Sequence, residues 1–178
     1  YPAKPVRIVV PYAAGGPYDE IARIVGQRLT EIWGQTVITD PRGGAGGSLG
    51  TDIAAKAPPD GYTLLLANAG PITINPSLRR DLPYDTLRDL TPITQVGSTT
   101  VALVSHSSLG VDSLEQFVQL ARAKPGTISW ASLGIGTGGH ITGELLRKRA
   151  GIDIVHVPFA GSSSAYRELL PGRVQAAF

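Results

Sequence analysis

The sequence feature that most constrains the fold is a strand, a small-residue loop and a helix start, which follow one another within residues 5–23. Four of the five residues in 6–10 are β-branched, which is typical of a short strand buried on both faces. The segment 11–16 (PYAAGG) ends this run, and Pro17 stands where a helix can begin. A helical pattern of apolar residues follows and ends before Gly34. This order predicts an α/β fold.

The same loop predicts an anion site. Gly15 and Gly16 precede the expected helix, whose exposed N–H groups and positive dipole end suit a negatively charged group. Side chains at these two positions would block the approach of a ligand. Alternatively, the two glycines only allow the chain to turn. This stretch alone does not favour an anion site over a simple turn.

The remainder of the chain alternates between strand-like and helix-like stretches, which predicts a parallel sheet with right-handed crossovers. A helix is expected from Ser48, with Ser48 as a possible N-cap, and Ser113 is a second possible N-cap. Asn75 is interpreted as a turn former. The strands are expected at residues 36–39, 62–67, 128–133, 153–159 and 174–178, and the later helices at 113–123, 141–150 and 161–170.

Two lobes are expected. Residues 91–105 contain two strand-like runs separated by Gly97 and Ser98, which predict a hinge between a first lobe, 1–98, and a second lobe, 99–178. The second half repeats the order of strand, Gly/Ser-rich loop and helix. The chain stops on the apolar run 174–178, and a strand there would leave an edge exposed.

Composition excludes several classes of protein. The formal net charge is +2 and no long basic run exists, so nucleic acid is not an expected partner. The absence of cysteine excludes disulfides, thiolate metal sites and cysteine nucleophiles. No run of 18 apolar residues exists, so no membrane span is expected. No signal-peptide pattern precedes Tyr1, so we expect that any such segment has been removed or was never present.

A dinucleotide site is not supported, although Gly134, Gly136 and Gly139 fit the pattern G-x-G-x-x-G between a strand and a helix. The pattern needs an acidic residue at the end of the following strand to hold the ribose. Asp153 lies at about the right distance, but it begins that strand. No cofactor is therefore expected.

A serine hydrolase is the alternative function from another class. Residues 46–50 fit G-x-S-x-G with Ser48 at its centre. A nucleophile elbow places the serine directly after a strand, whereas glycines intervene here. Ser48 is better interpreted as an N-cap or as a neutral hydroxyl near a ligand.

The histidines do not predict a metal site. His106, His140 and His156 lack the spacing of zinc ligands. His140 follows the second glycine loop and is well placed to contact a bound group, whereas His156, in mid-strand, is interpreted as a packed or surface residue. No paired carboxylates indicate acid–base catalysis.

Neutral hydrogen-bond donors on loops before helices are the pattern that remains. Backbone N–H groups, hydroxyls and helix dipoles can hold a carboxylate without a paired arginine. Such a set predicts binding and no catalysis. The side chains concerned are Ser48, Asn68, Ser132, Thr137, Ser162 and Ser163.

These segments resemble a known family. The chain is similar to the periplasmic solute-binding proteins of tripartite tricarboxylate transporters, the TctC-like or Bordetella-uptake-gene type. The resemblance covers nearly the whole chain, in the order YPAKPVRIVVPYAAGGPYDEIAR, DPRGGAGGSLGTDIAAKAPPDGYTLLLANAG, NPSL with LPYDTLRDLTPITQV, ISWASLGIGTGGH, DIVHVPFAGSSSA and LLPGRVQAAF.

The resemblance implies a two-lobed periplasmic-binding-protein (type II-like) architecture that closes on a small organic carboxylate, such as a di- or tricarboxylate or an aromatic acid. It implies delivery to membrane permease subunits, export to the periplasm and no enzymatic activity. The implied ligand-binding residues, which lie on four loops, are Tyr12, Ala14, Gly15, Gly16, Asp19, Ala67, Asn68, Ser132, Gly136, Thr137, His140, Gly161 and Ser162.

Two departures from the family pattern affect these expectations. Where the family usually has N-R-P-G-A-G-G, this chain has DPRGGAGG at residues 40–47. Family members also continue beyond the last strand and return to complete the first lobe, so this chain is expected to be a fragment or a truncated member. An incomplete first lobe predicts self-association through exposed apolar surface. A truncated scaffold that binds no ligand is a further alternative.

Overall fold

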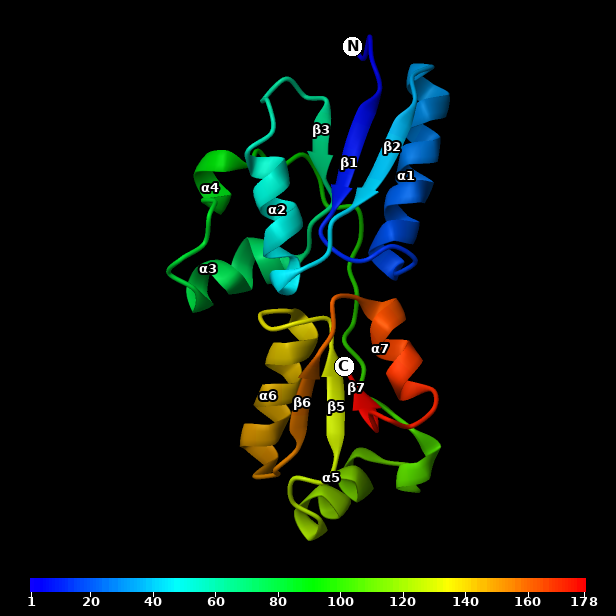
Figure 1. Cartoon of the computed structure of the whole chain (residues 1–178), viewed down its shortest axis with the longest axis vertical. Helices are drawn as coiled ribbons and strands as arrows, with labels where there is room; N and C mark the ends of the chain where they lie inside the picture. The colour runs from blue at the N-terminus through cyan, green and yellow to red at the C-terminus, as the bar shows by residue number, and fades with distance from the viewer. The chain divides into compact units, whose positions relative to one another are not determined.

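Two units make up the chain, unit 1 from Tyr1 to Thr94 and unit 2 from Gln95 to Phe178. The computed structural model in Figure 1 describes all residues, 1–178. The expected lobes, 1–98 and 99–178, place their boundary slightly later in the chain. Each unit is an α/β structure with its own sheet, as the sequence predicts.

Unit 1 is built on a three-stranded parallel sheet with the strand order β2-β1-β3. Its strands are β1 (Val6–Val10), β2 (Val37–Pro41) and β3 (Thr63–Leu65). Its helices are α1 (Pro17–Trp33), α2 (Ser48–Ala55), α3 (Asn75–Leu78) and α4 (Thr86–Asp89), with a 3₁₀ turn η1 (Ala45–Gly47) and a π-helical turn η2 (Gly70–Ile74). The glycine at the end of α1, Gly34, has a left-handed conformation and closes the helix, as expected.

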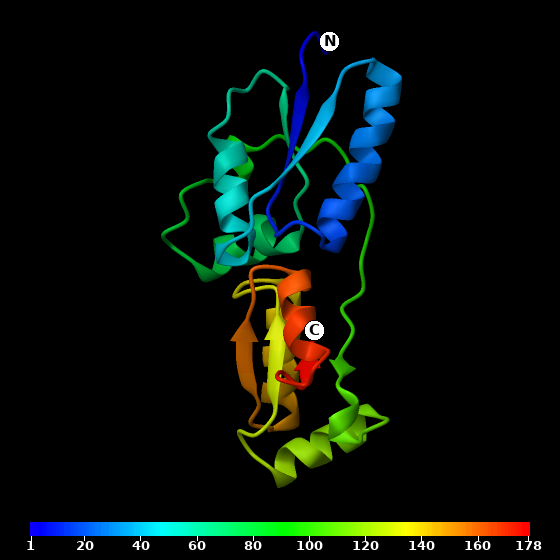
Figure 2. The same ribbon diagram turned by 45° about the vertical axis from the view of Figure 1, so that its right-hand side comes forward.

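Helices cover both faces of this sheet, as the views in Figures 1 and 2 agree. Ile8 and Val10 point to the side on which α1 lies, and they form a buried cluster with Ala22 of that helix. Val9, which alternates with them, is fully buried on the opposite side, where α2 contacts β1 and β3. A strand buried on both faces is what the run of β-branched residues predicts.

Unit 2 is built on a mixed four-stranded sheet with the order β4-β7-β5-β6. Only the β4–β7 pair is antiparallel. The strands are β4 (Val104–Ser105), β5 (Ser129–Ser132), β6 (Val155–Pro158) and β7 (Ala176–Ala177). The helices are α5 (Leu114–Ala123), α6 (Gly138–Ala150) and α7 (Ser162–Leu169), preceded by the 3₁₀ turn η3 (Ser107–Leu109). Ser113 caps α5 by accepting a hydrogen bond from the Gln116 N–H, as expected.

The core of unit 2 lies on both faces of β5. Trp130 is fully buried on one face together with Phe117 of α5, and the adjoining residue Ala131 is buried on the other face with Ala165 and Leu169 of α7. The alternation along one short strand therefore supplies both halves of the core.

Two expectations about strands are wrong. The run that ends the chain is not an exposed edge, because β7 pairs with β4 on one side and with β5 on the other. In the segment 91–105, only Val104 and Ser105 form a strand. Residues before them have β-forming side chains but no neighbouring strand, and most are exposed. None of the helices combines the length and the apolar character needed to cross a membrane.

Candidate functional site

The loops after β1 and β3 meet at one edge of the unit 1 sheet. Val9 and Leu65 are register partners in these parallel strands. Tyr12 and Asn68 each lie three residues further along, and the Tyr12 hydroxyl donates a hydrogen bond to Asn68 Oδ1 at 2.8 Å. The expected convergence of these two loops is therefore correct, and Ala67 enters the same turn directly after β3.

Asn68 connects two tyrosines. Its Oδ1 also accepts the Gly70 N–H at 3.1 Å, and its Nδ2 donates to the Tyr18 hydroxyl at 2.6 Å. The rings of Tyr12 and Tyr18 stack with their centroids 4.7 Å apart. Burial raises the pKa of the Tyr12 phenol well above its usual range, so the phenol stays protonated.

Asp19 closes the glycine loop of unit 1. Its Oδ2 accepts the Gly15 N–H at 2.9 Å and pairs with Arg23 Nε at 3.1 Å. Gly15 has φ +75°, a conformation that favours glycine. Gly16, the N-cap of α1, has no side chain to cap the helix, and Ala14 lies in the same loop. Asp19 is buried and its Oδ1 has no hydrogen-bond partner.

Ser48 is neither an N-cap nor a nucleophile. The N-cap of α2 is Gly47, and Ser48 is the first residue of the helix. Its Oγ is buried and accepts Asn75 Nδ2 at 2.9 Å, with the Tyr84 hydroxyl at 3.4 Å. All three histidines of the chain lie in unit 2, so no histidine of its own unit is available as a base. Asn75 is likewise no turn former, because it is a fully buried residue that ties Ser48 to the loop before α2.

In unit 2, the loops after β5 and β6 also meet at one sheet edge, since Ser132 and Pro158 are register partners. Ser132 Oγ accepts the Gly134 N–H at 3.1 Å and lies 2.6 Å from His156 Nε2. Gly161 and Ser162 follow β6 at this edge, where Gly161 is the N-cap of α7 and Ser162 is buried.

His156 belongs to a stack of rings on the α6 side of the sheet. Its ring lies 4.2 Å from that of Trp130 and 4.6 Å from that of His140. Burial, and secondly the neighbouring His140, lower the pKa of His156 to about 4. The imidazole is therefore neutral at pH 7 and can share a hydrogen with Ser132 in either tautomer.

The start of α6 is held by side chains of its own loop. Thr137 is the N-cap, its Oγ1 accepting the His140 N–H and donating to the Gly134 carbonyl at 2.7 Å. The Gly136 N–H donates to His140 Nδ1 at 3.3 Å. The first turn of α6 contains no acidic residue, so its positive dipole end is not offset locally.

The sequence therefore brings the expected site residues together within each unit. They form two groups at strand ends, one around Asn68 and one around Ser132. The expected site residues do not include Tyr18, which bonds to Asn68. His156 is packed against Trp130, as interpreted, but its hydrogen bond with Ser132 was not expected. Each position had a local signal, since Tyr18 closely follows the glycine loop and His156 is two residues before the end of a strand. The partner of each, however, depends on strand order. No three His, Cys, Asp or Glu residues gather as metal ligands.

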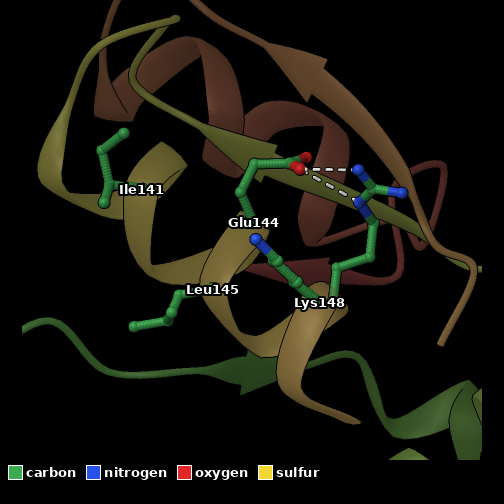
Figure 3. Close-up of a pocket in the computed structure, with 5 residues that line it drawn as sticks. Ile141, Glu144, Leu145 and Lys148 are labelled. Carbon is green, nitrogen blue, oxygen red and sulfur yellow. Dashed lines mark hydrogen bonds and ion pairs between the residues drawn. The ribbon is translucent and has the colours of Figure 1, made fainter. Parts of the chain in front are cut away.

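A shallow pocket on unit 2 is formed by a single helix. All its lining residues are on α6, and two of them, Glu144 and Arg147, form an ion pair (Figure 3). An open hollow on a single helix, in which Glu144 and Arg147 are already paired, offers little to a ligand. The residues are Ile141, Glu144, Leu145, Arg147 and Lys148.

Comparison with known proteins identifies the type of molecule that this chain resembles. Residues 21–178 match the tripartite tricarboxylate transporter family receptor. The protein BugT of Bordetella pertussis is 39% identical over 177 residues, which are 99% of this chain and 54% of BugT.

Solved structures of periplasmic binding proteins also match this chain. Rhodopseudomonas palustris Rpa4515, solved with adipate, is 33% identical with a TM-score of 0.95, over 99% of this chain and 59% of that one. MatC of the same organism, solved with malate, is 29% identical with a TM-score of 0.92, over 99% and 60%. The chain thus spans about half the length of the curated relatives it matches. Further neighbours are described as periplasmic, and the family and these neighbours are solute-binding proteins and not enzymes.

Proposed function

The chain belongs to the family of tripartite tricarboxylate transporter receptors, and on this premise we propose that it binds a small organic carboxylate in the periplasm. We also propose that the ligand is delivered to a membrane permease, as the family description of a transporter receptor suggests. The two solved neighbours that hold adipate and malate support a dicarboxylate as the first ligand to test.

The observation that carries this proposal is the set of neutral groups at the strand ends of each unit. Unit 1 offers the amide and phenols around Asn68, and unit 2 offers the N-terminus of α6 with no acidic residue in its first turn. Such groups suit the binding of a carboxylate that must later be released. The buried hydroxyl of Ser48, held by an amide and a phenol, argues against the hydrolase alternative.

We propose the expected residues as the ligand site, with contacts that come mainly from backbone N–H groups and hydroxyls. The position of the loops supports this assignment. The loops of both units begin at the carboxyl ends of parallel strands, where α/β proteins bind ligands. The residues are Tyr12, Ala14, Gly15, Gly16, Asp19, Ala67, Asn68, Ser132, Gly136, Thr137, His140, Gly161 and Ser162.

Thermal unfolding in the presence of carboxylates tests the function. The panel is adipate, malate, citrate and benzoate, and adipamide is the uncharged control for adipate. A ligand at 100 times its Kd stabilises the native state by about 2.7 kcal/mol, which raises the Tm by several degrees. We expect this rise for at least one carboxylate and none for adipamide. A flat response to all four acids, from folded protein, contradicts the proposal for this chain. Repeating the measurement with a chain of the relatives' full length distinguishes an incomplete site from a wrong ligand class.

Self-association is a separate part of the proposal. Exposed isoleucines on unit 1 support it, namely Ile24 and Ile32 of α1 and Ile38 of β2. Sedimentation over a hundredfold range of concentration is the measurement. A monomer mass at every concentration would contradict self-association and would not affect the proposal of carboxylate binding.

A further inference from the structure

The amide of Asn68 has only one possible orientation. The Gly70 N–H lies 3.1 Å from Oδ1, and a backbone N–H can only donate, so this atom must be the amide oxygen. Exchanging oxygen and nitrogen would set two donors against each other. The amide nitrogen of Asn68 therefore faces the Tyr18 hydroxyl, 2.6 Å away.

This orientation fixes the roles of both phenols. The Tyr12 O–H donates to Asn68 Oδ1, so its only hydrogen is used, and the Tyr12 side chain is 3% exposed. The oxygen of Tyr18 instead accepts a hydrogen from Asn68 Nδ2. The hydrogen of the Tyr18 hydroxyl is consequently left for another acceptor, and the structure gives it none.

Tyr18 is also the phenol that lies at the glycine loop. It is the second residue of α1 and immediately follows Gly16 and Pro17. Its ring is partly buried and is held in place by stacking on Tyr12. Two backbone positions of the loop offer no donor, because the Gly15 N–H is bound to Asp19 and Pro17 has no N–H. A hydroxyl beside the loop can therefore add a donor that these two positions do not supply.

We propose that the Tyr18 hydroxyl donates a hydrogen bond to the carboxylate of the ligand, and that Asn68 and Tyr12 position it without touching the ligand. This inference rests on the proposed function and deepens it. It adds Tyr18 to the binding site and changes the role of Asn68 and Tyr12 from contact to positioning. A phenol that donates to a carboxylate forms a charge-assisted bond, which is stronger than a neutral one.

The Tyr18→Phe variant tests the contact. It keeps the stacked ring and removes only the hydroxyl. We expect the Kd for adipate, or for malate where malate binds more tightly, to rise by about 10- to 100-fold with little change in Tm. The matched control is Tyr62→Phe, whose hydroxyl accepts the Ala3 N–H at the other end of the same sheet. This control is expected to bind like the wild type.

The Asn68→Asp variant tests the positioning role. A carboxylate at residue 68 can still accept from Tyr12 and Gly70, but it also accepts the hydrogen of Tyr18 and so withdraws it from the ligand. We expect weaker binding in a folded protein. In the Tyr18→Phe background the same change should cost less, because only its charge then acts against the ligand.

The outcomes separate the two proposals. Ligand binding by the wild type with an unchanged Kd in Tyr18→Phe overturns this inference and leaves the proposed function standing. Failure of the wild type to bind any carboxylate of the panel overturns both. Equal losses for Asn68→Asp in the two backgrounds overturn the positioning role.

Discussion

The two units use the same order of strand, loop and helix, but they hold their loops with different chemistry. In unit 1, an amide at residue 68 joins two phenols and a backbone N–H, and an acidic residue, Asp19, closes the glycine loop. In unit 2, the loop is held by the hydroxyl of Ser132 and the imidazoles of His156 and His140. The unit 1 amide does not titrate, whereas burial lowers the pKa of the His156 imidazole to about 4. The polar centre of the unit 2 loop therefore responds to acid, whereas the amide at the centre of the unit 1 loop does not.

The difference extends to the helices that follow these loops. The first turn of α1 contains Asp19 and Glu20, whereas the first turn of α6 contains no acid and is capped by Thr137. Carboxylates near a helix N-terminus offset its positive end. The α6 loop thus offers the stronger field for an anion, and the α1 loop must rely more on defined hydrogen bonds. Each unit contains one tryptophan, Trp33 or Trp130, so the stability of each can be followed separately by fluorescence.

The largest expected effect concerns two helical glycines that face their sheets. A Cβ at Gly143 of α6 would lie 2.4 Å from an atom of the fully buried Trp130, whereas at Gly26 of α1 it would lie 3.4 Å from the Val37 side chain. We expect Gly143→Ala to destabilise unit 2 by about 3 kcal/mol through overpacking. Gly26→Ala should leave unit 1 unchanged or stabilise it by up to about 1 kcal/mol through helix propensity.

Urea unfolding followed at Trp130, in a Trp33→Phe background, measures the first change. The same experiment at Trp33, in a Trp130→Phe background, measures the second. Similar free energies of unfolding for wild type and Gly143→Ala would show that the indole can move aside. The packing difference between the units would then not hold.

The second prediction compares the polar centres of the two loops. Asn68→Ala leaves the buried Tyr12 O–H and the Gly70 N–H without an acceptor, which should cost about 2–3 kcal/mol of the free energy of unfolding of unit 1. Ser132→Ala removes one acceptor of the Gly134 N–H and should cost unit 2 about 1–2 kcal/mol. A cost of Asn68→Ala below that of Ser132→Ala would reverse the comparison.

These loop centres also show how far sequence reasoning reaches. The strand before Tyr12, the helix from Pro17 and the C-cap at Gly34 follow from local patterns, and all are present. The prediction of two strand-like runs in the segment 91–105 was wrong, because residues with β propensity form no strand without a neighbouring strand to pair with. The central position of β7 was missed for a related reason, since strand order is set by contacts distant in the sequence.

The candidate site was predictable only in part for the same reason. Residues on glycine loops are visible locally, and the expected loops do converge at strand ends. The hydrogen-bond partners are not visible. That Asn68 bridges Tyr12 and Tyr18, and that His156 reaches Ser132, depends on the register between strands and on which face each side chain takes.

The third prediction concerns acid. The pKa of His156 is about 4 in the folded unit 2, below the value of about 6.5 expected when unfolded, because burial disfavours the charged ring and His140 adds repulsion. Glu144 opposes this effect only weakly. Since the unfolded chain binds the proton more readily, the stabilisation is complete above pH 6.5 and is lost as the pH falls towards 4.

After allowance for partial exposure of the ring, this loss should amount to about 1–2 kcal/mol between pH 7 and pH 4.5. The measurement is the free energy of unfolding at Trp130 against pH, for the wild type and for His156→Gln. The variant should lack this part of the slope. Unit 1, which contains no histidine, should show no corresponding change in this range, and equal pH profiles for wild type and variant would exclude His156 as the cause.

The smallest expected effect distinguishes the two helix starts. Thr137 Oγ1 caps α6 and also donates to the Gly134 carbonyl, whereas the N-cap of α1 is a glycine with no side-chain bond. Thr137→Ala should therefore cost unit 2 about 1 kcal/mol of free energy of unfolding, and Thr137→Ser, which keeps the hydroxyl, should cost only a few tenths. Because the cap also holds the Gly134 turn against Ser132, Thr137→Ala should lower carboxylate affinity more than Thr137→Ser does. If both variants bind equally well, the hydroxyl of residue 137 stabilises the helix but does not shape the loop.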